Sequence, residues 1–147
     1  MGTHPSAANE VTIERPVDQV FAFFSNPEND TRWRSGLVKM THESGQGVGA
    51  RYAQKMKGPG GLPINADIEV VALDPLRRIE FMTVSGPVRP RGRFLFSEAA
   101  GGTNVRFELD AQLGVLKGLL MGPMVKKTMA SEVGHLTRAK EVLERGN

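Results

Sequence analysis

The side chains best suited to acid–base chemistry in this sequence are three histidines and the acids near them. His4 lies close to the N-terminus and His42 near the end of a predicted strand, and neither has partners at metal-ligand spacing. His135 follows Glu132 by three residues, a spacing that brings two side chains together on one helix face. Such a pair transfers protons when it borders a cavity and is a simple ion pair when it lies at the surface. Glu132 and His135 are therefore candidates for catalysis, and we expect no metal site and no cofactor.

Several classes of chemistry are excluded by what the sequence lacks. The 147-residue chain has no cysteine, which rules out disulfides, thiolate nucleophiles and cysteine-ligated metals. It has no phosphate-binding loop and no Gly-x-Ser-x-Gly nucleophile motif. Nineteen basic and sixteen acidic side chains leave a net charge of +3, which is too small and too evenly spread to indicate nucleic-acid binding. The lack of cysteine and of an apolar stretch long enough to span a membrane predicts a cytoplasmic protein.

Hydrophobic periodicity predicts the elements that position these residues. Alternating apolar and polar residues are typical of half-buried strands, which we predict over 10–15, 37–43, 49–56, 65–73, 78–84, 89–97 and 103–111. Helices are predicted after Pro16, over 27–31, and from Pro123 to about Arg145. Short turns rich in glycine, proline and aspartate between the strands favour an antiparallel meander. The fold class is therefore α+β: a seven-stranded curved antiparallel sheet, two short helices after the first strand, and a long C-terminal helix across the concave face.

Chain length and composition predict the domain organisation. We expect residues 10–145 to form one domain of ordinary length, and residues 1–9, which are small and polar, to form a flexible N-terminal tail. We expect a monomer or a homodimer.

Side chains that the alternation turns inward are candidates for the lining of a cavity. We expect a bound ligand to contact residues from three predicted strands, from the helical segment and from the final helix, namely Trp33, Tyr52, Gln54, Phe81, Phe94, Met129, Val133 and Leu136. The alternative is that these side chains only fill the core. Gln54 is the candidate for orienting a polar group of the ligand, and Tyr52 is a further candidate for proton transfer.

Weak motifs in a consistent order resemble a known superfamily. The sequence opens with VTIERPVDQVFAFF from Val11 and continues with Asn26-Pro27-Glu28-Asn29, Trp33, Asp74-Pro75, Gly101-Gly102-Thr103 and Lys140-Glu-Val-Leu-Glu144. Over about residues 10 to 145 this resembles the SRPBCC superfamily of START-like, polyketide cyclase/dehydrase and birch-pollen-allergen proteins. The resemblance implies the helix-grip fold, a curved sheet wrapped around a long C-terminal helix with a ligand cavity between them. It also implies binding of lipids, sterols or polyketides and, in some members, cyclisation, aromatisation or dehydration.

Three functions follow as hypotheses. The first is binding of a hydrophobic small molecule, lipid or polyketide-like, in a cavity between the sheet and the C-terminal helix. The second is an enzyme of the polyketide cyclase or dehydratase kind acting on such a ligand. The third is a partner-binding or stress-modulating protein, which a fully packed interior together with an exposed apolar patch would favour.

Overall fold

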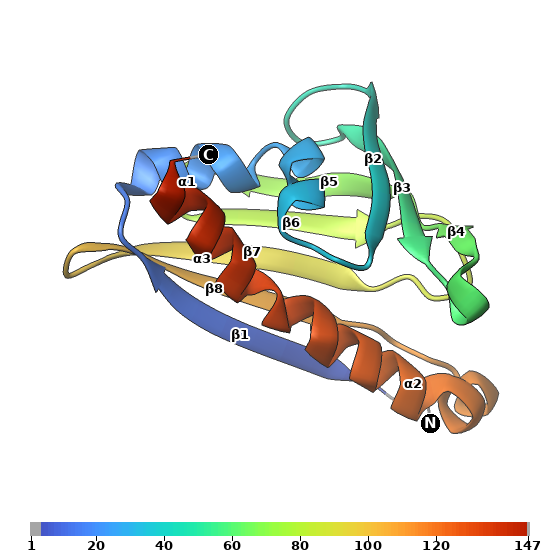
Figure 1. The fold of residues 1–147 in the computed structure, drawn as a ribbon. Coiled ribbons are helices and arrows are strands. Elements are labelled where there is room, and N and C mark those ends of the chain that lie inside the picture. Colours follow the sequence, from blue (N-terminus) through green and yellow to red (C-terminus); the bar gives the residue numbers. More distant parts are fainter. Residues whose placement is uncertain (1–3, 147) are drawn as a thin grey trace.

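A curled antiparallel sheet dominates the computed structural model, which describes residues 4–146 (Figure 1). Its main path has seven strands in the order β1-β8-β7-β6-β5-β3-β2. Their bounds are β1 Ser6–Ile13, β2 Leu37–Ser44, β3 Arg51–Lys57, β5 Ile68–Asp74, β6 Arg78–Thr83, β7 Arg91–Ala99 and β8 Gly102–Asp110. A short strand that the periodicity did not indicate, β4 (Pro63–Asn65), pairs with β3 outside this path, after the 3-10 turn η2 (Pro59–Gly61). The predicted α+β fold is confirmed.

The sequence alternation sets which face of each strand is buried. In β8, Val105, Phe107 and Leu109 are buried while the residues between them are half exposed. Phe94 of β7 lies opposite Phe107 in the register, and the two rings stack with their centroids 4.5 Å apart. This cross-strand pair fixes the inner face of the sheet, because a slip of one residue in either strand would turn the ring of that strand to the outer face.

The first strand begins earlier than predicted, which corrects part of the expected tail. Ser6 to Asn9 were expected in a flexible segment, but they pair with the edge of β8, from Ser6 opposite Asp110 to Asn9 opposite Phe107. Their small side chains hide the alternation in the sequence. The backbone groups along β8 are satisfied only when β1 extends this far.

Two short helices follow β1, as predicted. The α-helix α1 (Val17–Phe24) begins directly after Pro16 and buries Phe23 and Phe24. The 3-10 helix η1 (Pro27–Arg32) begins after Asn26, whose side chain accepts a hydrogen bond from the backbone N–H of Glu28. Of these two helices, α1 packs on β7 and β8, and η1 packs on β2.

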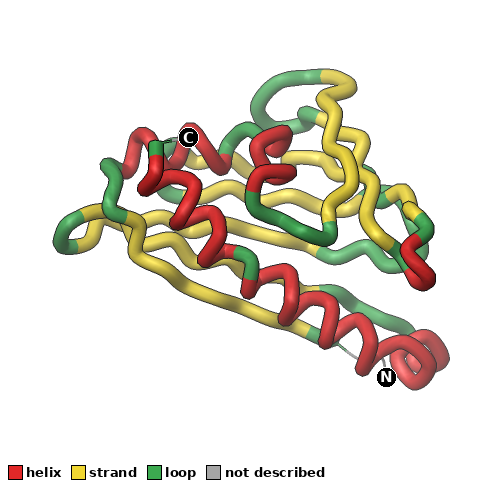
Figure 2. The backbone as a smooth tube through the Cα atoms, in the orientation of Figure 1, coloured by secondary structure: helices red, strands yellow, loops and turns green. Residues whose placement is uncertain are grey.

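The C-terminal helix crosses the inner side of the sheet in two segments, α2 (Val115–Gly134) and α3 (Leu136–Arg145), separated at His135 (Figure 2). Its predicted start at Pro123 is wrong, because the helix begins eight residues earlier. Pro123 lacks an N–H and so leaves the carbonyl of Leu119 without its helical donor. Leu119 is exposed, so water can satisfy that carbonyl and the helix tolerates the proline.

The early start of α2 leaves an apolar face in solvent. Leu116, Leu119 and Leu120 are 71%, 76% and 74% exposed. Within residues 4–146 no helix is both long and apolar enough to cross a membrane.

Candidate functional site

A cavity of about 180 Å³ lies between the two short helices and the inner face of the sheet. Its walls are mainly aromatic and aliphatic. They come from α1, η1, β3, β5, β6, β7 and the connecting segments next to α1 and β3, namely Phe21, Phe24, Ser25, Pro27, Asp30, Gly47, Ala50, Tyr52, Ile68, Val70, Leu73, Ile79, Phe81 and Phe94. A cavity of ~150 Å³ accepts benzene, whereas sites for drug-sized ligands measure roughly 300–1,000 Å³. The volume therefore fits one ring or a short chain.

A carboxyl group interrupts this apolar lining. Asp30 is only 4% exposed and borders the cavity from η1. Its Oδ2 atom accepts a hydrogen bond of 3.0 Å from Nη1 of Arg34, one turn further along the chain. Beyond the contact between their side chains, the buried Oδ1 atom of Asp30 and Nε1 of Trp33 have no hydrogen-bond partner among the described residues. Arg34 thus holds one oxygen of the carboxyl group, and the indole of Trp33 lies beside that group, where its hydrogen bond lowers the pKa of Asp30.

Arg34 connects this carboxyl group to two distant elements. Its Nε donates to Oε2 of Glu132 on α2, and its Nη1 donates to Oε1 of Gln54 on β3, each at 2.9 Å. All four side chains are buried, and we call Asp30, Arg34, Gln54 and Glu132 the Arg34 cluster. One guanidinium faces two carboxyl groups, so the cluster carries a net negative charge when both are ionised.

Burial controls the protonation of Asp30. It raises the pKa of the carboxyl group from 3.8 to about 6, because the charged form loses its solvation. The charge of Arg34 and the hydrogen bonds from Arg34 and Trp33 act in the opposite direction, and the charge of Glu132 adds to the increase. Asp30 therefore changes its protonation state in mildly acidic solution.

Three of the expected ligand contacts do line the cavity, namely Tyr52, Phe81 and Phe94. Their role in binding stays a prediction. Gln54 is instead held inside the Arg34 cluster, where its Nε2 donates to the carbonyl of Ala66 at 2.8 Å.

The other expected contacts lie in the packed core and do not line this cavity, so their role in binding also stays a prediction. Trp33, Met129, Val133 and Leu136 are each at most 4% exposed and belong to the main hydrophobic cluster. The helix packs closely on β1 and β8, so the cavity borders α1 and η1 rather than the C-terminal helix.

The expected pair of Glu132 and His135 is not formed. The carboxylate of Glu132 turns inward to Arg34, while Nε2 of His135 lies 2.9 Å from Oγ of Ser35 near the surface. The helix is interrupted at His135, so the regular three-residue spacing does not apply. Tyr52 lies on the cavity wall, and burial, followed by the charge of Glu28, raises the pKa of its hydroxyl. That shift makes Tyr52 a weaker proton donor.

Sequence analysis missed Asp30 and Arg34. They lie in the polar run PENDTRWR, which has the composition of a solvated turn. Their spacing of four residues around Trp33 was the available signal, since an acid and a base at that spacing pair on one side of a helical turn. Within residues 4–146, no group of three or more acidic or histidine side chains is arranged to hold a metal ion.

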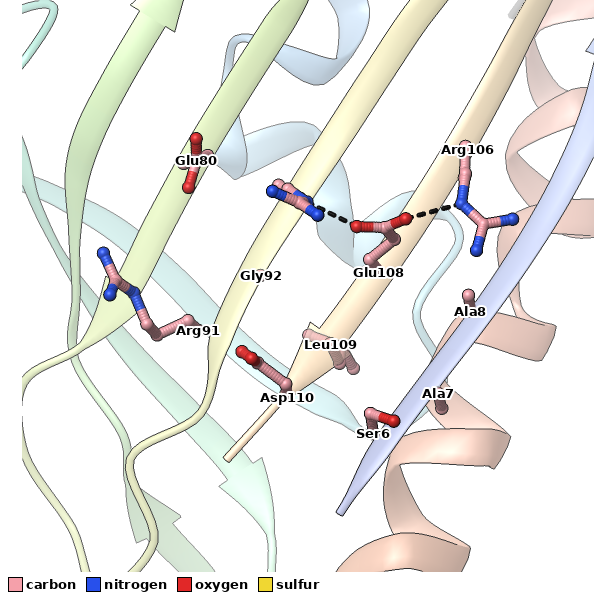
Figure 3. Close-up of a pocket in the computed structure, with 11 residues that line it drawn as sticks. Ser6, Ala7, Ala8, Glu80, Arg91, Gly92, Arg106, Glu108, Leu109 and Asp110 are labelled. Atoms are coloured by element: carbon pink, nitrogen blue, oxygen red, sulfur yellow. Dashed lines mark hydrogen bonds and ion pairs between the residues drawn. The ribbon is translucent and has the colours of Figure 1, made fainter. Parts of the chain in front are cut away.

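A larger hollow of about 610 Å³ lies on the outer side of the sheet (Figure 3). Its floor is formed by charged side chains that pair with one another: Glu108 lies between Arg93 and Arg106. Arg91 and Arg93 of β7 both border this hollow. Because Arg93 is already paired with a carboxylate at an exposed position, we place the candidate site in the inner cavity.

Comparison with known proteins gives a family and a fold. Residues 4–144 match the family described as polyketide cyclase / dehydrase and lipid transport. No protein of curated function is similar enough in sequence to count as a relative.

Solved structures of similar fold cover nearly all of the chain. TTHA0849 from Thermus thermophilus is 22% identical with a TM-score of 0.80, and the match covers 97% of this chain and 100% of that one. DR_A0006 from Deinococcus radiodurans is 20% identical with a TM-score of 0.72, covering 97% and 99%. The di-domain ARO/CYC protein StfQ from the steffimycin biosynthetic pathway is 12% identical with a TM-score of 0.79, covering 97% of this chain and 51% of StfQ. At these identities the likeness is one of fold.

Proposed function

We propose that this chain, which belongs to the polyketide cyclase / dehydrase and lipid transport family, binds a hydrophobic small molecule in the cavity between α1, η1 and the sheet. The observation that carries the proposal is the cavity itself, a space of about 180 Å³ with walls of Phe, Ile, Val and Leu side chains. Apolar surface removed from water there contributes ~25 cal/mol per Å² to affinity.

The cavity volume limits what fits without rearrangement. One ring or a short acyl chain fills about 180 Å³, whereas a multi-ring polyketide needs a larger space. A ligand of that size would require α1 or η1 to move away from the sheet. We therefore propose compact apolar molecules as the ligands that this cavity binds.

The second candidate function is catalysis of the cyclase or dehydratase kind. The observation that favours it is Asp30, a buried carboxyl group on the cavity wall whose pKa is raised to about 6 by burial. A group that titrates near neutral pH is suited to accept and return a proton. In this hypothesis the apolar walls hold the substrate, and the carboxylate of Asp30, positioned by Arg34, accepts a proton from it.

Partner binding stays a third hypothesis and ranks below the other two. A fully packed interior combined with an exposed apolar patch would favour it. The leucines of α2 do form such a patch, but the interior contains a cavity.

Native mass spectrometry of the purified protein, followed by organic extraction, tests the proposal, with calorimetric titration of toluene as the second step. We expect a co-purifying small apolar molecule, or saturable binding of toluene at one site per chain. A spectrum without added mass together with no heat from toluene would contradict it. We further propose that the protein acts in the cytoplasm as a monomer or homodimer, which cell fractionation and sedimentation would check.

A further inference from the structure

Three segments that are distant in the sequence adjoin at one end of the molecule, where β4 and the start of α2 project (Figure 1). A Cβ atom at Gly86, in the connection between β6 and β7, would lie 2.6 Å from the carbonyl oxygen of Asn65 at the end of β4. Nζ of Lys117 on α2 donates to the carbonyl oxygen of Pro87 in the same connection, at 3.0 Å. The three segments therefore form one surface. We call it the α2-end surface, made of residues 57–65, 84–90 and 115–127.

Large apolar side chains of this surface are exposed to solvent. The helix α2 packs on the protein through one side, where Val125 and Met129 are buried. Leu116, Leu119 and Leu120 lie on the opposite side, since their spacings of one, three and four residues place them on one face of the helix.

The segment before β4 adds to this apolar area. Leu62 is 71% exposed, and Met124, four residues after Leu120 on α2, is 50% exposed. Large apolar side chains that gather on one part of a surface mark an interaction site.

The charged side chains of the α2-end surface all have the same sign. Residues 44–66, 84–97 and 111–131 contain no aspartate and no glutamate. The exposed basic side chains on the surface are Lys57, Arg89, Lys117, Lys126 and Lys127. Exposed leucines bordered by lysines are complementary to a partner that offers hydrocarbon beneath a layer of negative charge.

We propose that the α2-end surface docks on an anionic lipid bilayer, with the leucines of α2 at the level of the upper acyl chains and the lysines beside the lipid phosphates. The docking is peripheral, because within residues 4–146 no helix is long and apolar enough to span a membrane. A second copy of the chain fits this surface less well. A two-fold interface would bring the lysines of one chain towards those of the other, and like charges repel. The inference goes beyond the proposed function and does not depend on what the cavity binds.

Flotation of the full-length protein with lipid vesicles tests the proposal. One set of vesicles contains phosphatidylcholine alone, and the other contains phosphatidylcholine and phosphatidylserine at about 7:3. We expect the protein to bind the mixed vesicles at least about fivefold more strongly than the neutral ones, and to bind them less as NaCl rises from about 0.1 M to about 0.5 M. No binding to the mixed vesicles, or equal binding to both kinds, would overturn the proposal.

Two variants with matched controls assign the binding to this surface. Leu120→Ser should lower the affinity for the mixed vesicles by about tenfold, and Lys127→Glu by about fivefold or more. The control for the first is Val48→Ser, because Val48 is 61% exposed and precedes β3, at the end of that strand opposite to η2.

The control for the second is Arg77→Glu, which makes the same change of charge. Arg77 is exposed and precedes β6, at the end of that strand opposite to residues 84–90. All four substituted side chains are exposed, so each variant should fold. Losses of affinity in the controls as large as those in the two variants would overturn the assignment.

Sedimentation without lipid distinguishes a membrane from a second copy of the chain. We expect the wild type and Leu120→Ser to have the same oligomeric state. A wild-type dimer that Leu120→Ser dissociates would assign the surface to self-association and overturn the proposal. Toluene binding to Leu120→Ser should match that of the wild type, because Leu120 does not border the cavity. A failure of vesicle binding is thereby separated from a failure of the proposed function.

Discussion

Nε of Arg34 lies 2.9 Å from Oε2 of Glu132, although 98 positions separate the two residues in the chain. Both side chains are more than nine-tenths buried, so this ion pair connects the segment after η1 to α2 inside the molecule. It also holds the guanidinium where it can fix Asp30 on the cavity wall. The pair therefore links the stability of the fold to the geometry of the candidate site.

Removal of one partner of this buried ion pair should lower the free energy of unfolding. Glu132→Ala leaves the Arg34 guanidinium buried with less compensation, and we expect the free energy of unfolding to fall by about 3 kcal/mol. The matched control is Glu141→Ala, because Glu141 is exposed and its ion pair with Arg145 is long, at 3.9 Å. That change should cost less than about 0.5 kcal/mol. Urea unfolding measures both, and similar losses for the two variants would contradict a structural role for the buried pair.

The free energy of unfolding should depend on pH in a way that reflects the titration of Asp30. Its pKa in the folded state, about 6, exceeds the ordinary value of 3.8. Between these values the folded protein holds a proton that the unfolded chain has lost, so the Asp30 contribution is greatest below about pH 4 and is lost as pH rises through about 6. The maximum slope is about 1.4 kcal/mol per pH unit.

Comparison with Asp30→Asn isolates this contribution, because the pKa of Glu108 and of Glu144 is lowered and their contributions change in the opposite direction. Urea unfolding across this pH range should show the wild type gaining stability relative to the variant as pH falls. A constant difference, or a gain of the wild type with rising pH, would show that Asp30 has no raised pKa.

Filling the cavity should abolish binding without unfolding the protein. Ala50 is 2% exposed and borders the cavity, so the larger side chain of Ala50→Leu enters that space. We expect the affinity for toluene to fall at least about tenfold. Ala53→Leu is the control, since Ala53 alternates to the other side of β3 from Tyr52 and does not border the cavity. Equal toluene affinity in both variants would place the binding site elsewhere.

The position of the Phe81 ring depends on the absence of a side chain at Gly92. A Cβ atom there would lie 2.6 Å from Cε2 of Phe81 and 2.9 Å from Cδ2 of Leu109. Gly92→Ala must therefore displace the ring of Phe81, at a cost of about 1–3 kcal/mol and with weaker toluene binding.

At Gly134 a Cβ would meet no described atom within 4 Å, and Gly134→Ala should stabilise α2 by up to about 1 kcal/mol. Calorimetric melting of the two variants checks the contrast. A neutral effect at Gly92 would mean that the ring can move freely.

Much of the fold could be predicted because it depends on local patterns. The alternation of apolar and polar residues around Val105 and Phe107 predicted a strand with the correct inward face. The proline after β1 predicted the start of α1. Pro123 misled the prediction of the last helix, because a proline is also tolerated inside a helix where the freed carbonyl reaches water.

The site was less predictable because it depends on distant contacts. Tyr52, Phe81 and Phe94 reach the cavity through strand alternation, which the sequence displays. The burial of Asp30 and Arg34 depends on Glu132, which no local pattern relates to them. The volume of the cavity also depends on the distance between α1 and the sheet.

Intermolecular nuclear Overhauser effects from toluene to assigned methyl groups test the central claim most directly. If the ligand site lies between α1, η1 and the sheet, toluene protons should show contacts to the methyl groups of Ile68 and Ile79. Met129 and Val133, which are packed under the C-terminal helix, should show none. Contacts to Met129 and Val133 without contacts to the two isoleucines would contradict the account, as would the absence of any contact in saturating toluene.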